Sequence, residues 1–318
     1  MIRTIAAAIL AGGLALPAIA QDYPSDTIRL VVPWAAGGGT DRIARGFAEA
    51  LEEQAGVSVV VENVDGAGSI TGTVRVANAR PDGYTLLLNM DSAITGAMAY
   101  REIPVDFDDF VYIGGVYSSP TWIVSHSDQG LADLGALMER ARAEPDSVTI
   151  GTAGPAGSPM LMAAAIAAAA DAGVRIIPYD GGASLKQALL GNQVTAGVIH
   201  APVMLPEVEE GMMTVLAAGE PLDAIVFEPL RGTPTLDAFG IEASFGLTRA
   251  IFAPADTPED VVATLTDLVR AAVESEGYAA FGEEFGFAPV WMDGDAFLAG
   301  MEDQRTSFTD IRQRFVTN

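Results

Sequence analysis

The feature that most constrains the fold is a recurring unit: an apolar strand, a turn rich in glycine, serine and threonine, and an amphipathic helix. Its first copy has the apolar run Ile28–Val32 and, after a turn, glycines at 37–39. A helix is predicted to open at Thr40, whose hydroxyl can cap it, with Asp41 in the first turn. Strands that alternate with helices form parallel sheets covered on both faces. The sequence therefore predicts an α/β fold.

Further copies of this unit divide the chain into two lobes. Apolar strands are predicted at 57–61, 85–88, 148–150, 174–177 and 194–199. Residues 110–124 and 217–252 combine apolar runs with glycine or proline, as expected of segments that cross between lobes. We expect each lobe to be a mainly parallel sheet flanked by helices, with two crossover strands and a cleft between the lobes. The predicted boundaries are 21–120 with 225–318 for lobe 1, and 121–224 for lobe 2.

Composition excludes several classes of chemistry. The chain has 318 residues with no cysteine and two histidines, so thiol nucleophiles, disulfides and zinc-thiolate sites are absent. Asp and Glu number 42 against 17 Lys and Arg, a formal charge of −25. Such a surface repels nucleic acids and anionic lipids. We therefore expect no metal, no cofactor and no nucleic-acid partner.

The N-terminus predicts export. Arg3 precedes an apolar run at 5–16, and small residues end at Ala20 before Gln21, which is the layout of a signal peptide over residues 1–20. The run is shorter than the roughly 20 residues that span a bilayer. Cleavage near Ala20 would leave a chain with no stable membrane anchor, and we expect a monomer.

Two glycine-rich turns are candidate anion sites. A turn without side chains that leads into a helix leaves backbone N–H groups unpaired, and the helix dipole adds positive potential. The turns are residues 37–40 and 151–158. A β–α turn also favours glycine for its geometry alone, but two such turns together favour a ligand.

The candidate ligand-binding residues share a place at the carboxyl ends of predicted strands, where open α/β sheets bind ligands. They are Trp34, Ala36, Gly37, Gly38, Gly39, Thr40, Asp41, Asp91, Ser92, Thr152, Ala153, Gly154, Ser158, Tyr179, Gly181, Gly182 and His200. His200 could instead be a structural or rim histidine. Arg249 could be a charge-assisted partner for a carboxylate or a member of a surface ion pair. No catalytic residue is predicted.

Several motifs in series resemble the tripartite tricarboxylate transporter receptors, also called the Bug family. They are YP at 23–24, IRLVVP at 28–33, GGGTD at 37–41, VEN at 61–63, GAG at 66–68, RPDGYTL at 80–86, PYDGG at 178–182, LLG at 189–191 and FAP at 252–254. The resemblance runs from residue 23 to the C-terminus. Trp34 stands where phenylalanine is common, and Ala35 and Ala36 where prolines are common, so the ligand is not carried over.

The resemblance implies a periplasmic solute receptor with the two-lobed periplasmic binding protein (Venus flytrap) fold. Such receptors capture a small carboxylate and deliver it to two membrane transporter subunits, one large and one small. In the family the turns matching 33–41 and 152–158 grip a carboxylate, while those matching 91–92, 179–182 and His200 contact the distal end of the ligand. Two alternatives remain: a receptor that signals to a sensor kinase, and a periplasmic lyase or isomerase acting on hydroxy acids.

Overall fold

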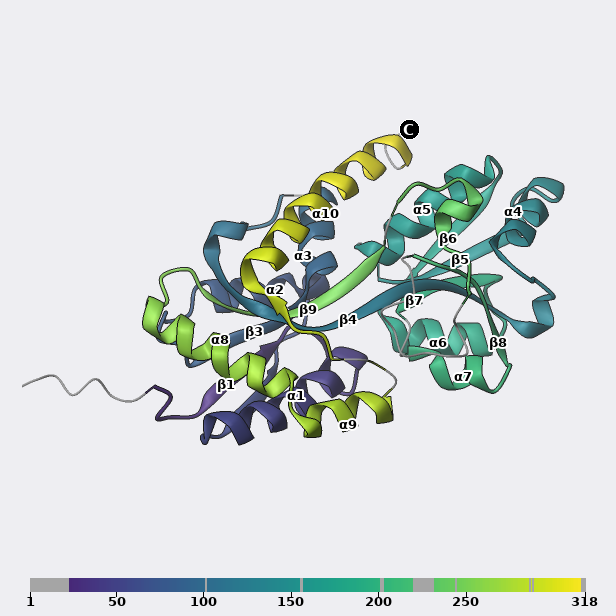
Figure 1. Cartoon of the computed structure of the whole chain (residues 1–318). Helices are drawn as coiled ribbons and strands as arrows, with labels where there is room; N and C mark the ends of the chain where they lie inside the picture. The colour runs from purple at the N-terminus through teal and green to yellow at the C-terminus, as the bar shows by residue number, and fades with distance from the viewer. Residues whose placement is uncertain are drawn as a thin grey trace, which may run out of the picture.

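The computed structural model describes residues 23–100, 102–154, 157–200, 203–219, 232–243, 245–285, 287 and 289–315. They form two lobes joined by long strands (Figure 1). Residues 1–20, predicted to be a signal peptide, and the predicted boundary at residue 225 lie outside the described residues. In the described ranges, no helix has the length and apolar character needed to cross a membrane.

The first lobe is built on three parallel strands. β1 (Ile28–Val32) lies between β2 (Val59–Asn63) and β3 (Thr85–Met90). One face of this sheet packs on the helices α1 (Gly39–Ala55), α8 (Glu259–Val273) and α9 (Glu276–Phe285). The other face packs on α2 (Ile70–Ala77), α3 (Asp91–Tyr100) and α10 (Gly294–Phe315). Short 3-10 turns lie at Ala67–Ser69 and Phe107–Asp109.

The second lobe repeats the arrangement. β5 (Val148–Ala153) lies between β6 (Val174–Tyr179) and β7 (Ala196–His200), all parallel. β8 (Met213–Ala218) completes this sheet. Its helices are α4 (Leu134–Ala143), α5 (Ser158–Ala170), α6 (Gly182–Leu190) and α7 (Leu205–Glu209), with 3-10 turns at Ser127–Gln129 and Leu236–Phe239.

Long antiparallel strands connect the lobes. β4 (Phe110–His126) runs from one lobe into the other (Figure 1). It pairs with β9 (Gly246–Pro254) as far as Pro120, and with β7 from Thr121 onward. β9 in turn pairs with β3, and the short strand β10 (Met292–Asp293) pairs with β4. Each sheet is therefore mixed, because antiparallel crossing strands lie beside its parallel strands.

Helix α10 forms a third connection. Phe297 and Met301 belong to the core of the first lobe, whereas Phe308 and Ile311 belong to the core of the second. The Phe308 ring stacks on Phe245, with centroids 6.2 Å apart. The sequence assigned 225–318 wholly to lobe 1. In the structure the second core includes Phe245, Phe308 and Ile311, because α10 continues past the first lobe and packs on α5 of the second.

The start of α1 differs from the prediction in one detail. The helix begins at Gly39 with Gly38 as N-cap, and no side chain caps it. Thr40 lies inside the helix, and its hydroxyl accepts hydrogen bonds from Arg249 instead. Asp41 is in the first turn, as predicted.

Candidate functional site

In the part of the chain that the structure describes, three helices that follow parallel strands begin after a glycine N-cap and have no capping side chain. The N-caps are Gly38 for α1, Gly157 for α5 and Gly181 for α6, so none can offer a side-chain oxygen to the first-turn N–H groups. In α1, the first helical amide with a backbone acceptor is that of Arg42, which donates to Gly38 O at 3.0 Å. The amides of residues 39–41 have no acceptor among the described residues. Such amides at a helix N-terminus bind anions.

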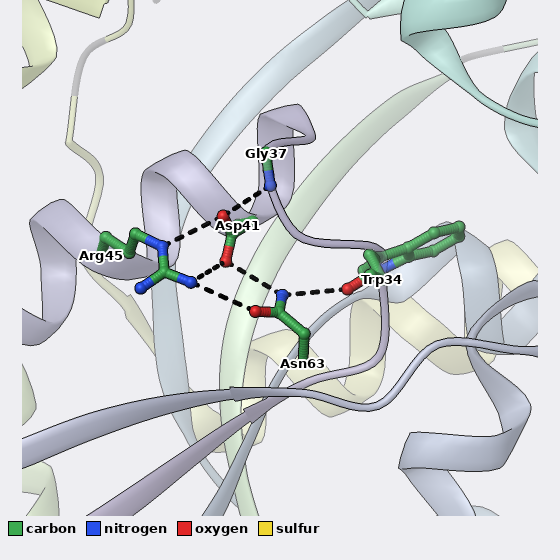
Figure 2. Close-up of polar contacts among 5 residues, drawn as sticks. All are labelled: Trp34, Gly37, Asp41, Arg45 and Asn63. Carbon is green, nitrogen blue, oxygen red and sulfur yellow. Dashed lines mark hydrogen bonds and ion pairs between the residues drawn. The ribbon is translucent and has the colours of Figure 1, made fainter.

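Asp41 fixes the turn before α1 (Figure 2). Its Oδ2 accepts from Gly37 N at 2.8 Å and from Arg45 Nε at 3.1 Å. Its Oδ1 accepts from Asn63 Nδ2 at 2.9 Å, and the same amide group donates to Trp34 O at 3.0 Å. The Gly37 amide, predicted to face a ligand, is thus occupied. Asp41 holds the loop in shape, and the free donors begin at Gly39.

Electrostatics keep Asp41 ionised. Burial alone would raise the pKa of this carboxyl, but the hydrogen bonds from Arg45, Gly37 and Asn63 outweigh burial and lower it. Arg45 Nη2 also lies 2.9 Å from Asp41 Oδ1, so the charge is paired. The loop therefore presents no bare negative charge to an approaching anion.

The turn before α5 is tied to the crossing strand. Ser158 Oγ lies 3.3 Å from Thr121 Oγ1, which lies 3.2 Å from His200 Nδ1. Thr121 thereby brings together two predicted site residues from β7 and α5. Sequence inspection missed Thr121, because nothing local marks a threonine inside a crossing strand. The hydroxyl of Thr152, by contrast, donates to Gly154 O at 2.8 Å and closes its own turn.

His200 remains a neutral imidazole near neutral pH. Burial, and secondarily the positive charge of Arg249, lower the pKa of His200 to about 3. An uncharged imidazole offers one donor and one acceptor. It can therefore hydrogen-bond a ligand without adding positive charge.

Val203 lies where the two lobes meet. A methyl group placed on Gly39 would be 4.0 Å from a Val203 methyl, and one placed on Gly182 would be 3.5 Å away. Lys186 Nζ donates to Val203 O at 3.1 Å and pairs with Glu207 at 2.6 Å. Val203 thus brings the starts of α1 and α6 together. The signal that could have found this segment is Lys186, the only lysine in the chain.

The start of α3 forms another contact between the lobes. A methyl group on Gly96 would lie 2.4 Å from Gly157 Cα, so α3 and the turn before α5 pack backbone against backbone. Asp91 Oδ1 accepts from Ser92 N, and Gln304 Nε2 of α10 lies 3.5 Å from Oδ2. Burial raises the pKa of Asp91 to about 7, although hydrogen bonds from backbone N–H groups and the Arg249 charge oppose the rise.

The remaining predicted residues lie around these turns. Trp34 is partly buried, and its Nε1 donates to Asn89 Oδ1 at 3.1 Å. Ala36 is exposed, while Ala153 and Tyr179 are partly buried and pack on a core cluster of the second lobe.

Neither a metal site nor the surface hollow beside β1 and β2 adds a second candidate site in the described part of the chain. Among the described residues, no group of three or more His, Cys, Asp or Glu side chains is arranged to hold a metal ion. A surface hollow of about 560 Å³ is lined by Asp26, Thr27, Arg29, Val60, Val61 and Glu62. It lies beside the start of β1 and along β2, includes none of the predicted site residues, and is lined by side chains of both charges.

Comparison with known proteins gives consistent matches. A family model described as tripartite tricarboxylate transporter family receptor matches residues 43–314. Protein BugT of Bordetella pertussis is 30% identical over 294 residues, which cover 91% of this chain and 89% of BugT. The periplasmic binding protein BugD is 27% identical with a TM-score of 0.80, over 92% of this chain and 98% of BugD. The R. palustris protein Rpa4515, solved with adipate, is 24% identical with a TM-score of 0.81, over 92% and 98% of the two chains.

Proposed function

The chain belongs to the tripartite tricarboxylate transporter receptor family, and on that premise we propose that it captures a small organic carboxylate between its lobes. The ligand class is a di- or tricarboxylate or a related organic acid. The captured ligand is then delivered to the two membrane subunits of a tripartite transporter.

The observation that carries the proposal is the set of helix starts at α1, α5 and α6, where no side chain caps the first-turn amides. Each helix follows a glycine N-cap, and each has at least eight residues, so its dipole is developed. The chain's formal charge of −25 repels anions at long range. Short-range amide donors must therefore supply the attraction, and they suit a carboxylate, which accepts several hydrogen bonds at once.

A ligand held by both lobes favours their closure. The turn before α1 belongs to the first lobe, and those before α5 and α6 belong to the second. A carboxylate docked on one turn gains donors from the other only when the lobes approach. Such a ligand shifts the population toward the closed form, which is the form a membrane partner can recognise.

Export agrees with this role. The predicted signal peptide at 1–20 directs the chain out of the cytoplasm, and cleavage near Ala20 releases the mature receptor into the periplasm. BugD, which has a similar structure, is a periplasmic binding protein.

A binding role is favoured over catalysis by the state of two candidate groups, Asp41 and His200. The Asp41 carboxylate is fully engaged by Gly37, Arg45 and Asn63 and cannot accept a substrate proton without loosening its own loop. The lowered pKa of His200 makes its imidazole a weak base. We expect stoichiometric binding without turnover of malate or citrate, and product formation would refute the proposal.

A thermal-shift screen of residues 21–318 tests the function. The panel is acetate, succinate, L-malate, adipate and citrate, with succinamide as the uncharged control. A ligand at 100 times its Kd adds about 2.7 kcal/mol to the unfolding free energy, which is a shift of several degrees. We expect at least one carboxylate to raise Tm while succinamide does not. Equal shifts with succinamide, or none with any carboxylate, would contradict the proposal.

A further inference from the structure

We propose that Arg249 is the ionic partner of the bound carboxylate and completes the anion site that the first turn of α1 begins. This inference rests on the proposed function and adds a named, charged specificity determinant to it.

Arg249 has the right position. It lies near the start of β9, where its backbone pairs with Met90 at the carboxyl end of β3 and with Tyr117 of the crossing strand. Its side chain reaches the first turn of α1, where Nη2 and Nε donate to Thr40 Oγ1 at 3.2 and 3.4 Å. The guanidinium is therefore beside the free amides of α1, at the edge of the sheet where α/β proteins bind ligands.

The charge of Arg249 is buried and has no direct ion pair among the described residues. Only 5% of the residue is exposed. Among the described residues, its Nη1 atom has no hydrogen-bond partner and no carboxylate lies within 4.0 Å of the guanidinium. Arginine stays protonated in proteins. A buried charge is normally paired, so this arrangement requires an anion that the chain itself does not supply.

The groups around Arg249 do not supply the missing anion. The guanidinium lies 4.8 Å from the centroid of the Tyr117 ring, a cation–π contact that leaves the charge intact. The hydroxyl of Tyr117 interacts with Ser119 and with Arg249 itself, and that of Tyr278 is buried without a hydrogen-bond partner among the described residues. Burial raises the pKa of both hydroxyls, so neither is a phenolate. Asp91, among the described residues, acts on Arg249 from beyond ion-pair distance, and its carboxylate accepts from the backbone amides of Ser92 and Thr248.

Two positive features meet at this point. The N-terminus of α1 carries the positive end of the helix dipole, and Arg249 places a full charge beside it. The two repel each other until an anion lies between them. A carboxylate satisfies both, because one oxygen can accept from the amides while the other accepts from Nη1. The ligand must therefore carry a fully ionised carboxylate at this end.

The test compares R249M with wild type in residues 21–318, by calorimetric titration with succinate, L-malate, adipate and citrate. For the carboxylate that wild type binds, we expect R249M to raise Kd at least tenfold, since a charge-assisted hydrogen bond is lost. We also expect the ligand-free Tm of R249M to equal or exceed that of wild type, because a buried unpaired charge has been removed. A purely structural arginine would lower that Tm.

R270M is the matched control. Arg270 of α8 also lies over an aromatic ring, 5.0 Å from the centroid of Trp291, so it loses the same charge and the same kind of contact away from the turns. We expect its Kd to stay within twofold of wild type. Equal Kd values for R249M and R270M would overturn the inference, as would a ligand-free Tm for R249M well below wild type.

The outcomes separate the two claims. If wild type binds none of the four acids, the proposed function itself fails. If wild type binds and R249M binds equally well, only the assignment of Arg249 fails. Should R249M not fold, R249K is titrated in its place; a Kd raised severalfold supports the assignment, and an unchanged Kd overturns it.

Discussion

Replacing Gly96 by alanine inserts a methyl group between the lobes. The new Cβ would lie 2.4 Å from Gly157 Cα and 2.9 Å from its nitrogen. Carbon atoms pack best at about 3.5 to 4.0 Å, so α3 and the turn before α5 must separate by roughly 1 Å. Overpacking of this size costs about 1–3 kcal/mol. The substitution therefore destabilises the state in which the α5 amides lie close to the first lobe. Carboxylate affinity should drop about 5- to 150-fold as a result.

Gly300→Ala is the control for this experiment. Gly300 lies within α10, and a methyl group there meets no heavy atom within 4 Å. Alanine in an exposed helix is favoured over glycine by up to about 1 kcal/mol, so G300A should raise Tm slightly and leave Kd unchanged. Calorimetric titration gives the carboxylate Kd of both variants for comparison. If G96A binds as tightly as G300A, contact between the lobes does not position the α5 turn, and the reasoning is wrong.

Three further substitutions test the site. Gly38→Val crowds the α1 amides with a side chain whose Cβ would lie 3.3 Å from Ala35 O. Titration should show a rise in Kd of at least roughly tenfold, while the unfolding free energy stays within about 1 kcal/mol of wild type. Unchanged affinity would count against the site. Asp41→Asn removes the charged acceptor of Gly37 and Arg45, so urea unfolding should show an unfolding free energy about 1–3 kcal/mol lower than that of wild type. An unchanged unfolding free energy would refute the positioning role of Asp41. The pKa of Asp91 is raised from 3.8 to about 7, so the folded protein binds the Asp91 proton more tightly than the unfolded chain does. The fold therefore keeps its full stability below about pH 4 and loses part of it as the pH rises through 7. Asp91→Asn should therefore stabilise the fold relative to wild type at pH 8, by up to about 4 kcal/mol, but not at pH 4; a difference independent of pH would contradict this.

Local periodicity predicted the elements of the fold well. β1 spans Ile28–Val32 as expected, and the buried face of α1 includes Ile43 and Phe47. β2 begins at Val59, two residues after its predicted start. These features depend on neighbouring residues in the chain, and an alternation of strands and helices can therefore be read from the sequence.

Partner choice between distant residues could not be predicted. Asp41 binds Asn63 and the amide of Gly37, which removes a donor that the glycine motif alone makes available. For the same reason, the sequence did not predict that α10 contributes to the cores of both lobes. Its apolar spacing marks a single face, but whether Phe297 and Phe308 meet the same lobe depends on where that face runs in three dimensions.

The most direct measurement is a crystal structure of residues 21–318 with the carboxylate that raises Tm most. We expect carboxylate oxygens within about 3.2 Å of the amides at the starts of α1 and α5. A ligand bound elsewhere, with these amides still facing water, would show that the helix starts are not the carboxylate site.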